Sequence, residues 1–480
     1  MTRVTRVTRM LPRSRPSDQG VPAAAVEAVL DALADAGLEL HSLMVLRHGH
    51  VVAEGWWAPY SSDRVHLLYS LSKSFTSTAV GLAVAEGRFA LADRVVDLLP
   101  ERVPDDVDPR VASLTVHHLL SMSTGHREDT LERAATLEPT DLARGFLRIP
   151  PEEAVGSRHA YNNTTTYLLA AIVEKHCGMP LLDYLQPRLF EPLGIEQARW
   201  DTDRGGRTLG FSGLHLQTES IAAFGQLLLQ DGVWRGERVL PEGWVALATR
   251  GHIDNDNDPA GPLDWRQGYG YQYWMSRHGF RGDGAFGQFC VVVPEADLVV
   301  ATTACVVDMQ AVLDVLWTQL LPALGEPQAG DAHVAAGRAL ADRLAALALP
   351  AVGDDRHPVV AGRREEARFQ VVDAGFDAPF DDGASVTVTP ETAGWTLHIE
   401  TPSGVAVLPV RADQWCEGSF GSGQPVVTRG GWTSTETFEA DVALIETPHR
   451  IRLRCNGVEA RAAWNQVPLT RPRLVVRHAT

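Results

Sequence analysis

Three short stretches, far apart in the chain, carry residue types that together could transfer an acyl group. They are Ser70-Leu71-Ser72-Lys73, Tyr161-Asn162-Asn163 and Gly284-Ala285-Phe286-Gly287-Gln288. A serine hydroxyl is a weak nucleophile that needs an adjacent base, and an amine one helical turn away can serve as that base. The first stretch therefore supplies a candidate nucleophile, Ser70, and a candidate base, Lys73.

The residues from Ser70 to about Glu86 are predicted to form a buried helix. Apolar residues recur there at helical spacing and a glycine follows them: Leu71, Phe75, Ala79, Leu82, Ala83 and Gly87. Ser70 would then lie at a helix N-terminus, where the helix dipole favours the negative charge that develops during attack. An S-x-x-K pattern alone recurs by chance, so the assignment depends on the other two stretches.

The second stretch has two compatible interpretations. As a structural feature, Tyr161-Asn162-Asn163 is a turn whose asparagine caps a helix from Thr164 to Lys175. As a functional feature, the start of a capped helix presents a tyrosine in a fixed position. Both interpretations can hold at once.

The third stretch is predicted to lie among antiparallel strands. The predicted strands are Gln272 to Arg277, Gln288 to Val293 and Leu298 to Cys305, with a turn at Pro294 to Asp297. The glycines of this stretch could mark a bulge in an edge strand. Alternatively, Gly287 could let the backbone approach a ligand closely.

The composition is that of an ordinary globular protein. The 480 residues are 45% hydrophobic and 21% charged, which is enough for two or three domains. The formal net charge of -17 argues against nucleic acid or an anionic membrane surface as partner, and no apolar run is long enough to span a membrane. The arginine-rich start has no signal-peptide core after it, so residues 1–20 are predicted to be a disordered basic tail.

Cysteine usage and metal-like motifs limit the location and chemistry further. Five widely spaced cysteines without a C-x-x-C pair favour buried thiols in a reducing compartment, so we expect a cytoplasmic protein. The acidic run Asp254 to Asp258 begins like a calcium loop, but Pro259 and Trp265 occupy the positions that need glycine and glutamate. We therefore predict no metal and no cofactor, and the sequence leaves the oligomeric state unknown.

The predicted elements divide the chain into segments. A helix from Ala23 to Ala36 and a hairpin of Ser42 to Arg47 and Val51 to Trp56 open a catalytic domain over residues 21–325. A linker and helix follow over 326–350. Residues 351–480 alternate short strands with turns and predict a small antiparallel sheet or barrel. This last domain either packs over the catalytic domain or contributes a loop to substrate choice.

Together the motifs resemble those of the penicillin-recognising serine hydrolases, which are the class C β-lactamases, the D-alanyl-D-alanine peptidases and their esterase relatives. The resemblance runs from about residue 43 to 321 and includes Tyr69 to Thr76, Thr115 to Gly125, Gly156 to Asn163, and Ser212 to His215 leading into Phe224 to Leu228. It implies the α+β class: a β-lactamase/transpeptidase-like domain with an antiparallel sheet and a helical lobe, followed by the small C-terminal antiparallel β domain. Two strands of the sheet would precede the helical lobe, over about 87–265, and three would follow it.

The resemblance also implies roles for particular residues. Ser70 would be the acylated nucleophile and Lys73 its base. Tyr161 would protonate the leaving group and later activate water, while Asn163 would orient Lys73 and the substrate carbonyl. The second motif, with its tyrosine, points to the class C and esterase branch and away from class A enzymes.

In the third motif the chain departs from its relatives. The backbone N–H of Gln288, after Gly287, would pair with that of Ser70 to form an oxyanion hole. In the preferred register Ala285 stands where the β-lactamases carry lysine, and a register three residues earlier puts Gly282 there. Neither residue supplies a cation for a substrate carboxylate.

Two nearby arginines, Arg277 and Arg281, could replace that missing cation. Unless one of them does so, we expect penicillins and D-alanyl peptides to be slow substrates.

The leading hypothesis is a serine hydrolase that opens an ester or amide of a small metabolite through a Ser70 acyl-enzyme. An acyltransferase with the same Ser-Lys-Tyr site, and a β-lactamase or D-alanyl peptidase, are the alternatives. A non-enzymatic ligand-binding module is the least supported, because Ser70, Lys73 and Tyr161 are all present.

Overall fold

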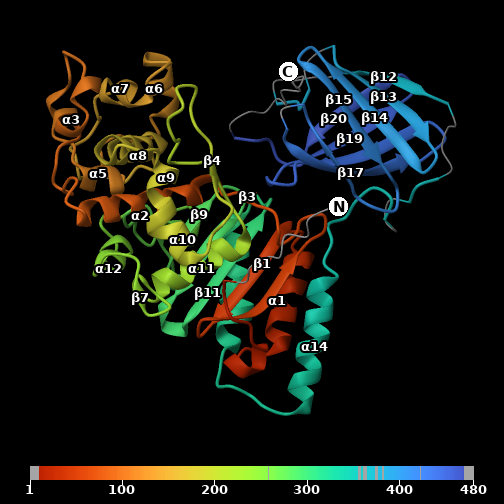
Figure 1. The fold of residues 1–480 in the computed structure, drawn as a ribbon, viewed down its shortest axis with the longest axis horizontal. Helices are drawn as coiled ribbons and strands as arrows, with labels where there is room; N and C mark the ends of the chain where they lie inside the picture. Colours follow the sequence, from red (N-terminus) through yellow and green to blue (C-terminus); the bar gives the residue numbers. More distant parts are fainter. Residues whose placement is uncertain are drawn as a thin grey trace. The chain divides into compact units, whose positions relative to one another are not determined.

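The computed structural model describes residues 10–257, 259–354, 358–360, 365–372, 377–380, 383–421 and 423–469. The chain forms two compact units (Figure 1). The first contains the residues up to 55 and residues 67–346, and the second contains residues 56–66 and those from 347 onward. A short segment, Trp56–His66, therefore belongs to the second unit although it interrupts the sequence of the first.

The first unit is built on a six-stranded sheet with the strand order β2-β1-β11-β10-β9-β8. The strands are β1 Leu40–Arg47, β2 His50–Trp56, β8 Trp274–Met275, β9 Phe280–Gly284, β10 Gln288–Val293 and β11 Leu298–Ala304. The pairs β1·β11, β10·β11, β9·β10 and β8·β9 are antiparallel, which confirms the predicted fold class. Strands β10 and β11 are buried at every position, which accounts for their runs of apolar and small residues.

One part of the strand prediction was wrong. Of the predicted strand Gln272 to Arg277 only β8 forms, and Gln272 has a left-handed φ of 65°. Strand β9 was not predicted, so four strands rather than three follow the helical region. The glycines and aspartate of β9 have weak strand propensity, and its pairing with β10 makes it a strand.

Helices surround this sheet, and the region between β2 and β8 is mostly helical, as predicted (Figure 1). The α-helices are α1 Ala23–Asp35, α2 Ser72–Ala85, α3 Val95–Leu98, α4 Pro109–Ala112, α5 Val116–Leu120, α6 Leu131–Leu137, α7 Leu142–Leu147, α8 Asn163–Cys177, α9 Leu181–Leu185, α10 Glu191–Leu193, α11 Thr218–Leu229, α12 Trp244–Ala248, α13 Met309–Val315 and α14 Asp331–Ala345. The 3-10 and π helices are η1 Pro16–Gln19, η2 Tyr69–Leu71, η3 Pro100–Arg102, η4 Gln186–Phe190, η5 Leu263–Trp265, η6 Pro294–Ala296, η7 Leu316–Leu320 and η8 Leu321–Ala323. Minor strands are β3 His66–Leu67, β4 Arg199–Trp200, β5 Leu214–Leu216, β6 Val233–Trp234 and β7 Glu237–Arg238.

Helix α11 packs directly on β1, β10 and β11. Its Gly225 allows this close approach, because an added Cβ there would lie 2.6 Å from Val299 Cγ1 and 2.9 Å from Cys290 Sγ. The sheet that positions the third sequence motif is thus fixed against a buried helix.

The N-terminal segment corrects the prediction of a disordered tail over residues 1–20. Residues 1–9 lie outside the described residues, but residues 10–20 are ordered and include η1. Val51 of β2 donates its backbone N–H to the Pro12 carbonyl at 2.8 Å and accepts from Ser14 at 3.0 Å. The segment therefore runs along the edge strand of the sheet.

A buried carboxylate explains why this segment is ordered. Glu219 on α11 is 6% exposed, and its Oε1 accepts from the backbone N–H groups of Met10 at 2.9 Å and Leu11 at 3.1 Å. Arg13 donates to the same oxygen at 2.5 Å and to Glu54 at 2.8 Å. A buried charge needs such partners, and the N-terminal segment supplies them.

The second unit is a nine-stranded sheet with the order β15-β14-β13-β12-β20-β19-β18-β17-β16. Its strands are β12 Ala367–Val371, β13 Ser385–Glu391, β14 Gly394–Thr401, β15 Gly404–Val410, β16 Cys416–Ser419, β17 Pro425–Trp432, β18 Thr437–Ala443, β19 Arg450–Asn456 and β20 Glu459–Trp464. Neighbouring strands in this sheet are antiparallel except β12 and β20, which are parallel.

The two ends of this sheet approach each other. Gly430 of β17 donates its N–H to the carbonyl of Arg411, just after β15, at 2.9 Å. The inside is filled by side chains such as Phe369, Leu408 and Phe438, so this unit is a nearly closed barrel with a solid core.

The segment Trp56–His66 is held by main-chain hydrogen bonds within the second unit. Ala58 donates to the Leu347 carbonyl at 3.0 Å and accepts from Leu349 at 2.9 Å. The Tyr60 hydroxyl donates to the Thr447 carbonyl at 3.1 Å. The segment is therefore a structural part of the barrel unit.

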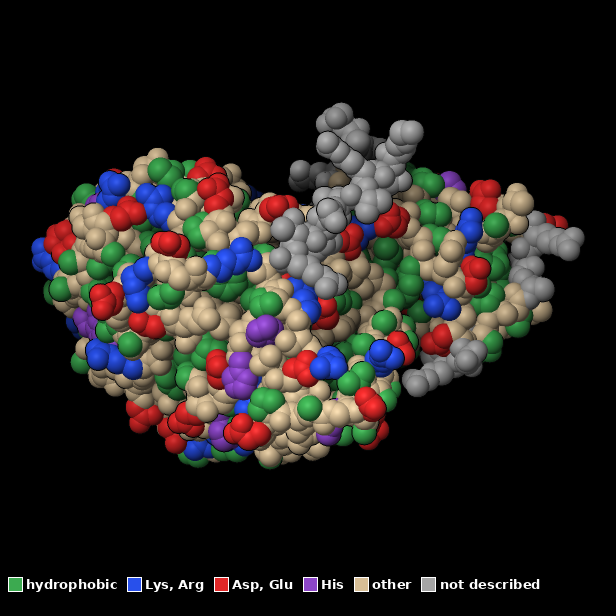
Figure 2. Space-filling view, turned by 60° about the horizontal axis from the view of Figure 1, so that its bottom comes forward, with side chains coloured by type: hydrophobic (Ala, Val, Ile, Leu, Met, Phe, Trp, Pro, Cys, Tyr) green, Lys and Arg blue, Asp and Glu red, His purple; other side chains and the backbone are tan. Residues whose placement is uncertain are grey.

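Two further observations concern the length of the helices and the charges on the surface. In the part of the chain that the structure describes, no helix is both long and apolar enough to cross a bilayer. On the face that Figure 2 shows, acidic and basic side chains are interspersed.

Deleting residues 1–15 should lower the free energy of unfolding. The deletion leaves the buried carboxylate of Glu219 without its three donors, and removing the partner of a buried charge costs about 3–5 kcal/mol. Denaturant unfolding measures the change. Deleting residues 1–9 keeps all three donors and is the control; equal stability of the two deletions would refute the role of this segment.

Candidate active site

Ser70 lies in a tight turn, η2, that leads directly into α2. Its neighbour Tyr69 has a φ of 48°, a left-handed conformation that a bulky residue adopts only under tertiary constraint. The Tyr69 ring packs edge-on against Phe286, with ring centroids 5.5 Å apart. Ser72 Oγ donates to the Tyr69 carbonyl at 2.6 Å, and these contacts hold the nucleophile turn in place.

Lys73 lies one turn into the helix region and is only 1% exposed. Its Nζ is 2.9 Å from Ser70 Oγ, 2.7 Å from Asn163 Oδ1 and 2.9 Å from the Phe211 carbonyl oxygen. Burial lowers the pKa of Lys73 to about 7, although the negative charges of two carboxylates work in the opposite direction. Lys73 can therefore exist as a neutral amine near neutral pH.

Tyr161 lies over the same amine. Lys73 Nζ is 4.7 Å from the centroid of its ring, and the ring stacks on Trp274 at a centroid distance of 5.4 Å. Burial raises the pKa of Tyr161 well above its ordinary value, while a hydrogen bond with Ser70 works in the opposite direction. The phenol is thus protonated at neutral pH and close to Ser70.

The predicted helix after Tyr161 is present as α8, and its asparagine cap is confirmed. Asn162 is the N-cap and accepts from the Thr164 N–H at 3.1 Å. The next residue, Asn163, points its Oδ1 at Lys73 and donates from Nδ2 to Asp129 Oδ2 at 2.6 Å. The sequence analysis missed Asp129, because an isolated acid in a loop has no distinguishing pattern.

The strand that touches the nucleophile turn is β9. A Cβ added at Gly284 would lie 2.0 Å from the Leu68 carbonyl oxygen and 3.1 Å from the Leu71 nitrogen. A Cβ at Gly282 would lie 2.5 Å from Ser74 Oγ. Both positions therefore need glycine in this packing, and no longer side chain fits there.

This geometry favours the earlier of the two registers considered for the third motif. Strand β9 ends at Gly284, and Ala285 lies in the turn beyond it. Gly282 lies in β9 against Leu71 and Ser74, whereas Ala285 lies beyond the strand. The site has no cationic side chain at either position.

Gly287 and Gln288 have structural environments that differ from those expected. Gly287 has a φ of 91°, and an added Cβ would lie 2.9 Å from Val306 Cγ2, so packing rather than ligand approach accounts for this glycine. Gln288 is fully buried in β10. Its side-chain amide donates to the carbonyls of Ala285 at 3.0 Å and Ala304 at 2.7 Å.

Two backbone N–H groups near the nucleophile are without acceptors. Across the described ranges, neither Ser70 nor Ala285 donates a backbone hydrogen bond. Gln288 instead pairs with Gly284 in the β9·β10 ladder.

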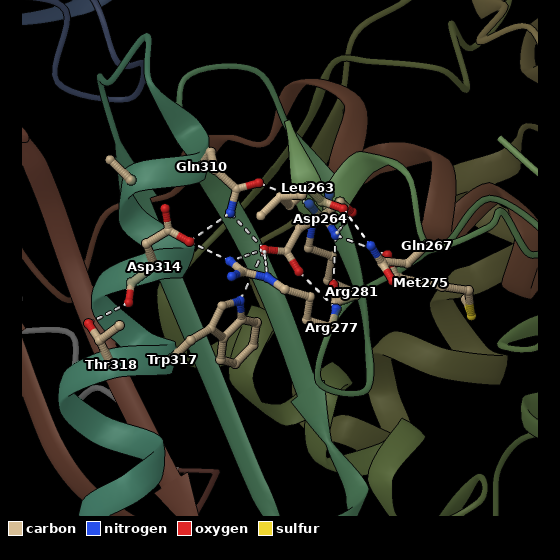
Figure 3. A network of polar contacts seen from close by, with 12 residues as sticks. Leu263, Asp264, Gln267, Met275, Arg277, Arg281, Gln310, Asp314, Trp317 and Thr318 are labelled. Carbon is tan, nitrogen blue, oxygen red and sulfur yellow. Dashed lines mark hydrogen bonds and ion pairs between the residues drawn. The ribbon is translucent and has the colours of Figure 1, made fainter. Parts of the chain in front are cut away.

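The two arginines that could have supplied a cation have other partners (Figure 3). Arg281 is fully buried, and it donates to Asp283 at 3.0 Å and to Ser276 Oγ at 2.6 Å. Arg277 binds Asp264 at 2.8 Å and also pairs with Asp314. Both guanidinium groups therefore take part in ion pairs within the first unit, although Nη2 of Arg281 is buried without a hydrogen-bond partner among the described residues.

The Asp264 carboxylate is the centre of this network (Figure 3). Burial raises its pKa, but hydrogen bonds from Arg277, Gln310 and Trp317 outweigh burial and lower the pKa to about 2. Asp264 thus stays charged and keeps Arg277 paired.

The described parts of the chain contain no set of side chains arranged to bind a metal ion. No group of three or more His, Cys, Asp or Glu side chains there is placed to hold a metal ion. What the geometry does bring together is a hydroxyl, an amine, a phenol and a carboxamide: Ser70, Lys73, Tyr161 and Asn163.

Comparisons with known proteins identify the family of the chain. A family profile described as Beta-lactamase matches residues 26–307. The 6-aminohexanoate-dimer hydrolase of Paenarthrobacter ureafaciens is 26% identical over 319 residues, which cover 61% of this chain and 81% of the relative. Esterase EstB of Burkholderia gladioli is 30% identical over 208 residues, which cover 38% and 53%. Penicillin-binding protein 4 of Amycolatopsis lactamdurans is 27% identical over 333 residues, which cover 59% and 81%.

Solved structures share the fold. A penicillin-binding protein homologue from Caulobacter crescentus superposes with a TM-score of 0.51 at 17% identity, over 62% of this chain and 97% of that one. SurE superposes with a TM-score of 0.51 at 19% identity, over 86% of this chain and 96% of that one. With more than half of its residues matched by the family profile, this chain is a member of the beta-lactamase family, whose esterases, amide hydrolases and peptidases are serine hydrolases.

Proposed function

We propose that this protein cleaves an ester or amide of a small metabolite through an acyl-enzyme on Ser70. The observation that carries the proposal is the buried amine of Lys73, whose Nζ lies 2.9 Å from Ser70 Oγ. A general base is most effective when its pKa lies near the working pH, and burial lowers the pKa of Lys73 to about 7.

The hydrogen bonds of Lys73 support its role as the base. A neutral amine has two N–H donors and one lone pair. Asn163 Oδ1 at 2.7 Å and the Phe211 carbonyl at 2.9 Å can accept from both donors. The lone pair is then left for the third neighbour, the hydroxyl of Ser70.

The first half of the reaction acylates the enzyme. Ser70 Oγ forms a bond to the substrate carbonyl carbon while its proton passes to Lys73 Nζ. When the bond to the leaving alcohol or amine breaks, the phenol of Tyr161 gives that group a proton and takes one from Lys73 in return. The raised pKa of Tyr161 supports this assignment, because the phenol starts each cycle with its proton.

Water completes the cycle. As water attacks the acyl carbon, its proton passes through Tyr161 to Lys73. The bond between the acyl carbon and Ser70 Oγ then breaks, and the serine oxygen recovers its proton from Lys73. Over the whole cycle one ester or amide and one water are consumed, one acid and one alcohol or amine are released, and the enzyme is restored.

We place the oxyanion hole at the backbone N–H groups of Ser70 and Ala285, in place of the earlier choice of Gln288. Neighbouring residues of a strand direct their N–H groups to opposite edges. Gly284 faces Gln288 of β10 and lies against the nucleophile turn, and Ala285 is the next residue, so we place the N–H of Ala285 on the edge away from β10, toward that turn. Neither proposed donor has an acceptor among the described residues, so both are free to bind a developing oxyanion.

A fluorophosphonate should add covalently to Ser70, because the adjacent Lys73 amine can activate its hydroxyl. Intact mass should show one adduct, and peptide mapping should place it on Ser70. Ser70→Ala should abolish labelling, whereas Ser157→Ala, at an exposed serine, should not. An adduct on Ser72 or Ser74 would rule the assignment out.

The value of kcat/KM for a neutral ester should rise with pH through an inflection at about 7, because protonated Lys73 cannot accept the proton of Ser70. Lys73→Ala should remove that inflection and lower kcat/KM by about 10²–10⁴-fold. Tyr161→Phe should cause a loss of similar size and keep the inflection. If the inflection persists in Lys73→Ala, another group is the base.

A neutral p-nitrophenyl ester should be a better substrate than a chromogenic cephalosporin at equal enzyme concentration. No side chain fits at Gly282, and Arg277 and Arg281 are held in ion pairs, so a substrate carboxylate lacks a cation. A charge-assisted hydrogen bond is worth about 1.5–3 kcal/mol, or roughly 10- to 150-fold in rate. Steady-state kcat/KM values test this, and efficient cephalosporin turnover would contradict the absence of a carboxylate site.

A further inference from the structure

Asp129 is an acidic side chain at the site that the steps above leave without a role. It lies in the loop before α6 and is exposed. Its Oδ2 accepts from Asn163 Nδ2 at 2.6 Å. Its Oδ1 accepts from the backbone N–H groups of Asn163 at 3.0 Å and Leu131 at 3.1 Å. Both carboxylate oxygens therefore bind donors, and two of those donors belong to Asn163.

The chemistry of the Asp129 carboxylate fixes which way the Asn163 amide points. An asparagine side chain has an acceptor oxygen and a donor NH₂, and a rotation of the amide exchanges them. An ionised carboxylate only accepts. Asp129 therefore holds the NH₂ of Asn163, and the oxygen is left to face Lys73 Nζ at 2.7 Å.

The orientation of this amide decides where the lone pair of Lys73 points. With the oxygen facing Nζ, Asn163 and the Phe211 carbonyl accept both N–H groups of the neutral amine. With the amide reversed, the NH₂ of Asn163 would donate into the lone pair. Ser70 would then lose its proton acceptor even though no residue had moved.

We infer that Asp129 is a positioning residue, which holds the Asn163 amide in one orientation and thereby directs the Lys73 lone pair at Ser70 Oγ. The inference rests on the proposed function, because it requires Lys73 to act as the base.

Charge gives Asp129 a second, separable effect. The titratable groups that face Lys73 are Asp129, Asp283 on β9 and the phenol of Tyr161 before α8. Burial lowers the pKa of Lys73, and the two carboxylates oppose that decrease. Removing the charge of Asp129 should therefore lower the pKa of Lys73 further and move the acidic limb of kcat/KM to lower pH. Because Asp129 is exposed, solvent screens this shift, and its direction rather than its size is informative.

The first comparison uses Asp129→Asn and Glu128→Gln. Both variants remove one exposed negative charge from adjacent positions, but only Asp129 contacts Asn163. Asp129→Asn should lower kcat/KM for a neutral ester by about 10-fold or more and shift the acidic limb to lower pH. Glu128→Gln should leave both quantities unchanged. Asp129→Glu, which keeps an acceptor-only side chain, should retain more activity than Asp129→Asn.

The second comparison exchanges the two side chains, so that an amide again donates to a carboxylate between positions 129 and 163. In Asp129→Asn combined with Asn163→Asp, the new amide donates to the new carboxylate, whose other oxygen can accept from Lys73. The net charge equals that of the unmodified protein. Assayed at a pH above its own acidic limb, this double variant should recover at least about 10-fold of the activity lost in Asp129→Asn, with non-additive energies as expected for groups in contact. Its acidic limb should move to higher pH, because a carboxylate then touches Lys73.

Two results would overturn the inference. They are equal kinetics of Asp129→Asn and Glu128→Gln, and no recovery in the double variant at a pH above its acidic limb. Thermal unfolding of every variant separates a loss of folding from a loss of orientation, since Asp129 also binds Leu131 at the start of α6.

A different set of results would refute the proposed function itself. If fluorophosphonate does not label Ser70 in the unmodified protein, the acyl-enzyme itself is wrong. If Ser70 is labelled and the pH inflection of kcat/KM depends on Lys73, while Asp129→Asn behaves like Glu128→Gln, only the role of Asp129 is refuted.

Discussion

The burial of the Lys73 amine is the constraint on which the active site depends. A lysine that is 1% exposed must either pair with a carboxylate or favour its neutral form. Here its three nearest polar neighbours are uncharged oxygens, from Ser70, Asn163 and the Phe211 carbonyl. The fold therefore favours the neutral form of a side chain that is ordinarily a cation. The position of α8 relative to α2 matters for this environment, because α2 carries Lys73 and α8 carries Asn163, which contacts its amine.

The parts of the site that the sequence predicts are those that local rules determine. The spacing of Ser70 and Lys73 places them one helical turn apart, and the structure has their polar atoms 2.9 Å from each other. Asn162 is an N-cap because its side chain satisfies a free N–H at the start of a helix, which a short pattern is sufficient to indicate. Buried strands β10 and β11 were equally visible as apolar runs between turn residues.

The parts that were missed depend on partners distant in sequence. Strand β9 carries Gly282 and Gly284, whose weak strand propensity is outweighed by pairing with β10 and by close contact with the nucleophile turn. The N-terminal segment looked like a solvated basic tail because its partner, Glu219, is indistinguishable in sequence from a surface acid. Asp129 was missed for the same reason: its importance comes from the donor it meets and not from its neighbours in the chain.

The segment Trp56–His66 has a consequence for the order in which the barrel unit can form during synthesis. Its hydrogen-bonding partners, including Leu347 and Thr447, lie hundreds of residues further along the chain. During synthesis on the ribosome, this segment therefore cannot form all of its hydrogen bonds until most of the protein has been made. The barrel unit is thus completed late, from two pieces of chain.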